Sequence, residues 1–302
     1  MSRSIHLSYS RLPSGLASYP RVFFTSRPPV TVVTDPTEVH VRVPQVYIDA
    51  KKVARYAAVC GFAPGSPLPA TYPHVLATPL QLKVFATRDF VLRPTGLIHL
   101  SNVIDTPGEL RVGSHYDLEV IARNYRPTDA GLAFDMDSEF SSEGQVVWRE
   151  TCVFLSRWPE PVERTGGRPS RPPRAPKDAE VLAEFDVPLG MAWRYARVSG
   201  DYNPIHLNQR LARSFGLRGA IIHGMWSLAR SLAAAPECAS LSGGRLTTQF
   251  LTPVLMPARV AVKQWMDEGT PRRALCDVRT GRVHMYAWWT GERAMPEAST
   301  PI

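Results

Sequence analysis

Cysteines are scarce in this sequence, and the few present are far apart. Cys60, Cys152, Cys238 and Cys276 form no Cys-x-x-Cys pair and no spacing typical of a disulfide framework. We therefore expect all four to be reduced thiols, as is usual for proteins of a reducing compartment.

Long apolar runs are also missing. No segment approaches the roughly 18 consecutive apolar residues that indicate a transmembrane helix. The N-terminus lacks the continuous apolar region of a secretory signal peptide. These absences argue against a membrane span and against export, so the expected location is the cytoplasm.

A nucleic-acid-binding motif is likewise absent, although the chain is basic, with a net charge of +8. Much of the excess comes from Arg and Lys residues between positions 164 and 177. We interpret this segment as a solvated basic linker that favours anionic partners, such as the phosphates of coenzyme A or an acidic carrier protein. Nucleic acid is not an expected partner.

The chain is long enough for two domains. It has 302 residues, of which 44% are hydrophobic, sufficient for an ordinary globular core. Composition shifts divide it into a Ser- and Pro-rich arm, a first domain, a Pro- and Arg-rich linker and a second domain. We place these at residues 1–37, 38–158, 159–178 and 179–302.

The first half combines helices with long strands. Val53, Tyr56, Ala57 and Cys60 have the spacing of one helix face, so a helix is expected over residues 48–61. A second helix is expected at 72–86. Strands are expected at 96–104, 115–125, 131–140 and 145–156, the last two joined by a turn at 141–144.

The second half repeats this pattern. The segment 54–61 resembles 193–200, which lies 139 positions later, and Thr106-Pro107 resembles Thr252-Pro253, 146 positions later. Similar halves indicate duplication of one α+β domain. Helices are expected at 204–215 and 224–235, and strands at 245–252, 258–266, 273–279 and 282–289.

One stretch of the second half carries the chemistry. Gly200 is suited to ending a helix, and Asn203 before Pro204 is suited to capping the next one. Asp201 then lies in a short connection, and His206 lies in the first turn of the following helix. This break lets an acid and an imidazole point into one pocket.

The stretch resembles the signature of the MaoC-like hydratases. Residues 195–206 match the pattern aromatic-x-x-hydrophobic-Ser/Thr-Gly-Asp-x-Asn-Pro-hydrophobic-His at every defined position. The likeness to the double hot-dog dehydratases of mycobacteria extends from about residue 38 to 290. It includes Thr71-Tyr72-Pro73, the Pro-rich linker, and a His-Gly pair at 223–224 before an apolar helix.

This resemblance implies a fold and a reaction. The fold is α+β, a double hot-dog with two long central helices wrapped by one continuous antiparallel sheet. The enzyme is a hydro-lyase that reversibly hydrates trans-2-enoyl thioesters to (R)-3-hydroxyacyl thioesters in fatty-acid metabolism. The substrate is a coenzyme A or carrier-protein thioester, and neither a cofactor nor a metal is expected.

The resemblance also implies roles for four residues. Asp201 and His206 are the expected catalytic pair, because together they can hold a water and exchange protons with it. Asn203 is expected to position the water or the loop. The backbone N–H of Gly224, at the start of the apolar helix, is expected to stabilise negative charge on the thioester oxygen. Close packing of helix and sheet is the alternative role for Gly224.

Three more residues belong to the expected surroundings. Phe62 stands where the second half has Asp201, so with Tyr195 it is predicted to line the pocket for the acyl chain. His223 is interpreted as structural, either a helix cap or a core residue. A metal site at Asp201, His206 and His223 is not expected, because their spacing matches no common ligand pattern.

Two other functions stay open from the sequence. One is a hot-dog acyl-thioesterase, and the other is a non-catalytic protein that binds acyl-CoA or an acyl carrier protein. Acyl chain length, the choice between coenzyme A and a carrier protein, and the physiological direction cannot be read from the residues. A homodimer is compatible with the sequence.

Overall fold

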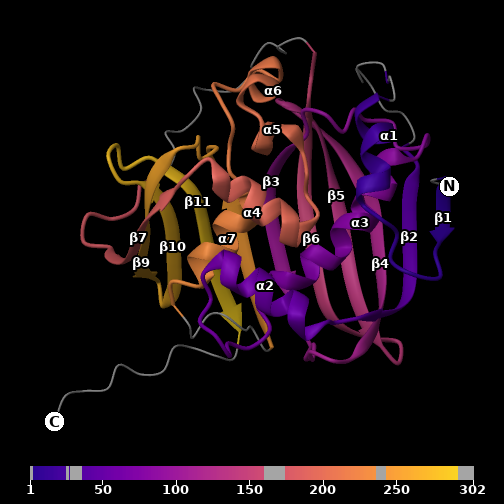
Figure 1. Cartoon of the computed structure of the whole chain (residues 1–302), viewed down its shortest axis with the longest axis horizontal. Coiled ribbons are helices and arrows are strands. Elements are labelled where there is room, and N and C mark those ends of the chain that lie inside the picture. The colour runs from indigo at the N-terminus through magenta and orange to yellow at the C-terminus, as the bar shows by residue number, and fades with distance from the viewer. Residues whose placement is uncertain (1–2, 25–26, 28–35, 160–173, 236–242, 292–302) are drawn as a thin grey trace.

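The computed structural model describes residues 3–24, 27, 36–159, 174–235 and 243–291. Its eleven strands form one curved sheet, and the helices lie against one face of that sheet (Figure 1). None of the helices in these ranges combines the length and apolar character needed to cross a membrane. Cys238 and most of the predicted linker lie outside the described residues.

The first half provides five neighbouring strands of the sheet, in the order β2-β4-β5-β6-β3. Two helices, α2 and α3, precede β3 in the chain. The bounds are β2 (Glu38–Tyr47), α2 (Ala50–Cys60), α3 (Tyr72–Ala86), β3 (Ile98–Asp105), β4 (His115–Thr128), β5 (Gly131–Ser142) and β6 (Gln145–Arg157).

The second half repeats this arrangement, with the strand order β7-β9-β10-β11-β8. Four helices, α4 to α7, lie between its first two strands. The bounds are β7 (Glu180–Val187), α4 (Gly190–Ser199), α5 (Pro204–Leu207), α6 (Gln209–Ser214), α7 (Gly224–Leu232), β8 (Gly244–Phe250), β9 (Ala258–Asp267), β10 (Thr270–Asp277) and β11 (Val283–Gly291).

The halves join through antiparallel pairing of β3 with β8. At one point of this pairing Asn102 lies opposite Thr248, and these two residues are 146 positions apart. The two Thr-Pro pairs have the same separation, so equivalent positions of the two strands face each other there. Each half therefore presents the corresponding strand to the other, as a duplicated domain requires. The predicted double hot-dog fold, with one continuous sheet, is confirmed.

Local sequence signals explain the helix ends. Gly61 and Gly200 end α2 and α4 with φ values of 83° and 75°, which is the left-handed conformation that glycine adopts readily. Asp49 begins α2 by accepting a hydrogen bond from the Lys52 N–H. The apolar faces of α2 and α4 pack against the two central helices, α7 and α3. α2 and α4 also contact each other (Figure 1).

The central helices differ in length. α3 has 15 residues and is buried along most of its length, with Pro79 inside it. α7 has 9 residues and ends at Leu232, earlier than the predicted end at residue 235. The helix predicted over 204–215 is also interrupted, because Asn208 ends α5 and caps α6 by accepting N–H bonds from Arg210 and Leu211.

The N-terminal arm has more regular structure than its composition predicts. It contains β1 (Ser4–Ser8), a short 3-10 turn η1 (Leu16–Ser18) and α1 (Tyr19–Phe24). β1 pairs in parallel with β2, so the sheet is antiparallel except at this edge. These elements depend on tertiary contacts, since α1 packs on α3, and local sequence patterns do not report such contacts.

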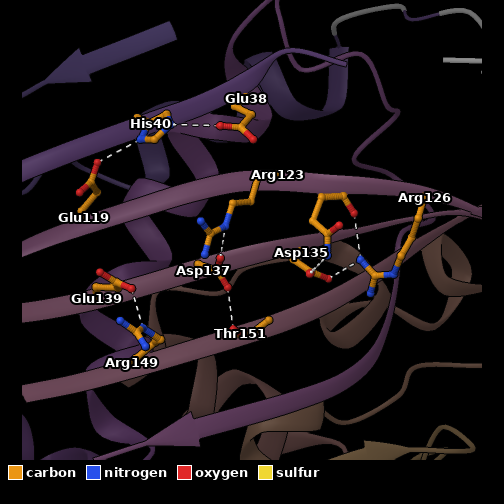
Figure 2. A network of polar contacts seen from close by, with 11 residues as sticks. Glu38, His40, Glu119, Arg123, Arg126, Asp135, Asp137, Glu139, Arg149 and Thr151 are labelled. Atoms are coloured by element: carbon orange, nitrogen blue, oxygen red, sulfur yellow. Dashed lines mark hydrogen bonds and ion pairs between the residues drawn. The ribbon is translucent and has the colours of Figure 1, made fainter. Parts of the chain in front are cut away.

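The face of the first-half sheet opposite the helices carries charged pairs between strands. Figure 2 shows His40 beside Glu119 and Arg123 beside Asp137, with nitrogen–oxygen distances of 3.1 Å and 2.6 Å. Both pairs are diagonal across neighbouring strands, since His40 lies opposite Ile121 and Arg123 lies opposite Asp135, and long side chains reach diagonal neighbours. The apolar core and the candidate site therefore lie on the helix side of the sheet.

Candidate active site

The loop between α4 and α5 folds as its residues predict. Gly200 ends α4, and the side chain of Asn203 caps α5 by accepting a 3.4 Å hydrogen bond from the Ile205 N–H. Pro204 occupies the first turn of α5. This geometry brings Asp201 Oδ2 to 3.9 Å from His206 Nε2. The predicted convergence of the acid and the imidazole is confirmed, while their catalytic roles stay predictions.

The two oxygens of the Asp201 carboxylate have different surroundings. Oδ1 accepts a hydrogen bond from the Asn203 N–H at 3.0 Å and lies 3.4 Å from the Tyr19 hydroxyl. Oδ2 lies 3.9 Å and 3.8 Å from the Nε2 atoms of His206 and His223. The side chain keeps 38% of its surface exposed. One oxygen is thus fixed by the loop, and the other faces the imidazoles.

The orientation of His206 is set by a backbone carbonyl. Nδ1 lies 2.9 Å from the Ile221 oxygen, which can only accept, so Nδ1 carries the proton and donates it. Nε2 therefore presents a lone pair toward Asp201. The distance of 3.9 Å is too long for a direct hydrogen bond between them.

The surroundings lower the pKa values of both Asp201 and His206. Burial raises the pKa of Asp201, but His223, His206 and the Asn203 N–H outweigh burial and hold that pKa below its usual value. Burial also lowers the pKa of His206, more than the Asp201 charge and the Ile221 carbonyl raise it. Near neutral pH, Asp201 is therefore ionised and His206 is neutral.

His223 contacts both members of the pair. Its Nε2 lies 3.0 Å from the backbone oxygen of Asp201, and its ring stacks on His206 with centroids 3.8 Å apart. Burial lowers the pKa of His223 to about 3, so the ring is neutral. His223 is the N-cap residue of α7, but its side chain makes no capping hydrogen bond and is buried, so of the two structural interpretations the core position fits the side chain. The side chain instead supports the backbone of Asp201.

Gly224 is the first residue of α7 and remains partly exposed. Its N–H belongs to the first turn, where backbone donors have no partner within the helix. A Cβ at this position would lie 3.1 Å from the Phe250 ring. The position therefore has a packing reason for glycine, and it also presents a backbone donor at the positive end of a helix. Its role as oxyanion donor stays a prediction.

The structure separates the two predicted pocket residues. Tyr195 is fully buried, with its ring 4.9 Å from that of His223, so it lies beside the site. Phe62 is buried. It follows Gly61, where an added Cβ would lie 3.1 Å from the Arg230 guanidinium. Arg230 is six residues after Gly224 on α7, or about 9 Å along the helix axis. Gly61 thus lies beside the Arg230 part of α7, and the pocket role of Phe62 stays a prediction.

Tyr19 reaches the site from the N-terminal arm, which sequence reasoning missed. Its hydroxyl accepts a 2.6 Å hydrogen bond from the Tyr202 N–H and lies 3.1 Å from the Gly200 oxygen. The contact joins positions more than 180 residues apart, so no local pattern could report it.

A second histidine–carboxylate pair lies in the first half and was also missed. His74 Nδ1 is 2.8 Å from Glu150 Oε2, and Asn102 Nδ2 donates to Glu150 Oε1 at 2.6 Å. Burial lowers the pKa of His74, but the Glu150 charge and hydrogen bond more than offset burial and raise it. Burial raises the pKa of Glu150, yet His74 and Asn102 hold it below its usual value. Both shifts favour the charged forms of the two groups.

The sequence did contain a signal for this second pair. Trp148, Glu150 and Cys152 occupy alternate positions of β6, and all three are buried. A glutamate on the core-facing side of a strand requires a buried partner. Alternation alone therefore indicates a polar contact inside the first half.

The donor atoms of Asp201, His206 and His223 lie close enough together to surround a metal ion. Their hydrogen bonds do not suit one, however. His206 Nδ1 and His223 Nε2 are each directed at a backbone oxygen, which leaves His206 Nε2 and the carboxylate as the outward-facing ligand atoms. Structural and catalytic zinc sites need at least three protein ligands. The arrangement fits acid–base chemistry better.

Comparisons with known proteins identify the family of the chain. Residues 164–286 match the model of the MaoC like domain. The chain is 32% identical over 278 residues to 3-hydroxyacyl-thioester dehydratase X of Mycobacterium tuberculosis, covering 91% of this chain and 97% of that relative.

Solved structures show the same architecture. The crystal structure of HtdX from Mycobacterium tuberculosis matches with a TM-score of 0.71 and 30% identity, covering 84% of this chain and 100% of the other. A MaoC-like dehydratase from Phytophthora capsici has the same fold, with a TM-score of 0.65, 16% identity, and coverage of 85% and 95%. The identity and coverage of the mycobacterial relative are decisive: the chain belongs to the MaoC-like family.

Proposed function

We propose that the chain is an (R)-specific enoyl-thioester hydratase and 3-hydroxyacyl-thioester dehydratase, a hydro-lyase of fatty-acid metabolism. The observation that carries the proposal is the arrangement of Asp201 Oδ2 and His206 Nε2, 3.9 Å apart in the signature loop. The name of the mycobacterial relative supports the same reaction. An ionised carboxylate and a neutral imidazole in this position match the needs of adding water to a double bond.

The separation of the pair suits one bridging water. Two hydrogen bonds of about 2.8 Å meeting at the water oxygen can span 3.9 Å at a bent angle. In hydration, the pair takes a proton from this water as its oxygen attacks Cβ of the enoyl thioester. The same pair then delivers a proton to Cα. Dehydration is the reverse, with loss of the α-proton and of the β-hydroxyl.

Charge that develops on the thioester oxygen needs a donor. We assign this role to the Gly224 N–H, because the first turn of α7 begins beside His223 and its dipole favours negative charge. The absence of a side chain lets the thioester approach the backbone. Asn203 keeps Asp201 in place through its own N–H and through its cap on α5.

No cofactor is required for this reaction, since the pair supplies the proton transfers. The substrate handle is coenzyme A or an acyl carrier protein. The free, buried thiols of Cys60, Cys152 and Cys276 support a cytoplasmic location. A homodimer stays a prediction that light scattering of the purified protein would test.

The proposal is tested by adding the protein to crotonyl-CoA and following both the conjugated thioester absorbance and free thiol. A hydratase removes the absorbance without releasing thiol, and product analysis shows 3-hydroxybutyryl-CoA. Release of thiol would identify a thioesterase instead. Binding with no change in either signal would identify a non-catalytic acyl-binding protein. Either of these results contradicts the proposal.

A further inference from the structure

The hydroxyl of Tyr19 lies against the backbone on both sides of Asp201. It accepts a hydrogen bond from the Tyr202 N–H at 2.6 Å, and its own proton is directed to the Gly200 oxygen at 3.1 Å or to Asp201 Oδ1 at 3.4 Å. One side chain thus contacts the residue before Asp201, the residue after it and its carboxylate.

We propose that Tyr19 is a positioning residue for the reaction, holding the Asp201 carboxylate against His206 from the N-terminal arm. The inference rests on the proposed function, because it assigns a role within the same site. Tyr19 touches neither His206 nor the reacting atoms of the substrate in this scheme, so it acts through Asp201.

The loop needs such a support. Gly200 is in the left-handed conformation directly before Asp201, and glycine leaves the backbone freer than any other residue. Without the Tyr19 hydroxyl, the Tyr202 N–H would lose its acceptor and the Gly200 oxygen a donor, which disfavours the present loop conformation. A displacement of Asp201 by about 1 Å is enough to slow a reaction substantially.

The arm is well placed to act as a fixed support. A Cβ added at Gly15 would lie only 3.2 Å from the Leu82 side chain of α3. The arm therefore packs closely on the first half. The Tyr19 ring packs on Phe23 and meets Tyr202 edge-on, with centroids 5.7 Å and 6.4 Å away. The arm therefore connects the first-half helix α3 to the catalytic loop of the second half.

The Tyr19 phenol stays protonated under working conditions. Burial raises its pKa, and the neighbouring Asp201 charge raises it further. The hydroxyl is therefore a permanent donor and not a proton-transfer group. This distinguishes positioning from acid–base chemistry, since Tyr19 itself adds no ionisation to the pH range of activity.

The test compares Tyr19→Phe with wild type, with Tyr9→Phe and with Asp201→Asn. Tyr9 is a matched control on the same arm, with its ring 5.6 Å from the Lys83 ammonium. We expect Tyr19→Phe to lower kcat roughly tenfold, with KM changed less than about twofold, because positioning acts on the chemical step. Tyr9→Phe should equal wild type.

A pH profile separates positioning from mere stabilisation of the fold. Asp201 and His223 face His206, and His74 acts on Asp201 from farther away. The Asp201 charge raises the pKa of His206. When Tyr19→Phe lets the carboxylate move away from His206, this pKa should fall. The acid limb of kcat/KM should then move to lower pH. Tyr9→Phe should leave that limb in place.

Two results would overturn the inference: unchanged kcat in Tyr19→Phe, or a loss of activity with an unmoved acid limb. The second result would assign Tyr19 a purely structural role. Inactive wild-type protein, or full activity in Asp201→Asn, would instead refute the proposed function. The failures of the two proposals are therefore distinguishable.

Discussion

Each half of the molecule contains a largely buried histidine facing a carboxylate, but the two pairs differ in geometry. In the first half, His74 Nδ1 and Glu150 Oε2 are 2.8 Å apart, and Asn102 Nδ2 donates a hydrogen bond to the other Glu150 oxygen. In the second half, His206 Nε2 and Asp201 Oδ2 are 3.9 Å apart. The first, closed pair is in direct contact, whereas the members of the second, open pair are too far apart for a direct hydrogen bond and can be bridged by one water.

The difference separates two uses of the same residue types. Glu150 is fully buried and its hydrogen bonds are directed at protein groups, so its charge is compensated within the fold. Asp201 is partly exposed, and its Oδ2 faces a lone pair on His206. The two halves share one topology, and among the described residues we propose that the Asp201–His206 pair of the second half is the one that serves a substrate.

The largest expected effect comes from removing either member of the second pair. Asp201→Asn and His206→Asn preserve polarity and approximate shape but remove proton transfer. Each should lower kcat roughly 10²–10⁴-fold with little change in Tm. Steady-state kinetics and thermal melts of the purified variants check this. Near-normal turnover in both variants would show that the open pair is not the acid–base pair.

The next effect concerns the donor at the start of α7. Gly224→Pro removes the N–H and should cost about 3 kcal/mol of transition-state stabilisation. Gly224→Ala is the matched control, because it adds a Cβ against Phe250 but keeps the donor. If Ala and Pro lower kcat/KM equally in folded protein, the loss is steric and Gly224 is not the oxyanion donor.

The closed pair should matter mainly for stability. Glu150→Gln removes one charge from a buried pair and should lower the free energy of unfolding by about 3 kcal/mol. Glu139→Gln is the matched control: its partner Arg149 lies on the exposed face of the same sheet (Figure 2), so it should cost at most about 1 kcal/mol. Equal costs, measured by denaturant unfolding, would contradict the comparison.

The contribution of the closed pair should also depend on pH. The folded-state pKa of Glu150 is lowered, so its stabilisation is present above about pH 4.5 and is lost as pH falls through the folded pKa. The folded-state pKa of His74 is raised, so its stabilisation is complete below about pH 6.5 and is lost as pH rises through the folded pKa. The stability difference between wild type and Glu150→Gln should peak between these values.

The smallest expected effect tests whether the first half accommodates the acyl chain. Phe62→Asp should not create a second active site, because no Asn and His follow it in the required positions. It should weaken long-chain substrates roughly tenfold more than crotonyl-CoA, since a charge would face the chain. Phe62→Leu is the apolar control. A loss of kcat/KM that is equal at every chain length would exclude Phe62 from the acyl pocket.

Much of the second half could be predicted because its signals are local. Gly200, Asn203 and Pro204 specify two helix ends within five residues, and this alone brings Asp201 toward His206. The succession of helices and strands along the second half followed from recognising the repeat. The break at Asn208 was missed, although asparagine is a common helix cap and does cap α6 here.

The remaining features depend on contacts between distant segments. Tyr19 lies in a Ser- and Pro-rich arm with no periodic pattern, and its partners at Gly200 and Tyr202 are about 180 positions away. His223 follows Ile222 at a helix start, where capping was the natural expectation. Its actual partner is the backbone of Asp201, which only the folded loop brings within reach.

The stereochemistry of hydration tests the central claim most directly. One pair that holds one water, with Asp201 and His206 on the same side of the substrate, must deliver the hydroxyl and the proton to the same face. Crotonyl-CoA hydrated by the enzyme in D₂O should therefore give (R)-3-hydroxybutyryl-CoA with a single deuterium at C2, added syn to the hydroxyl, as read by NMR. Anti addition would contradict the account, because this pair cannot serve opposite faces of the double bond. The (S) product would contradict the (R)-specificity of the proposed function.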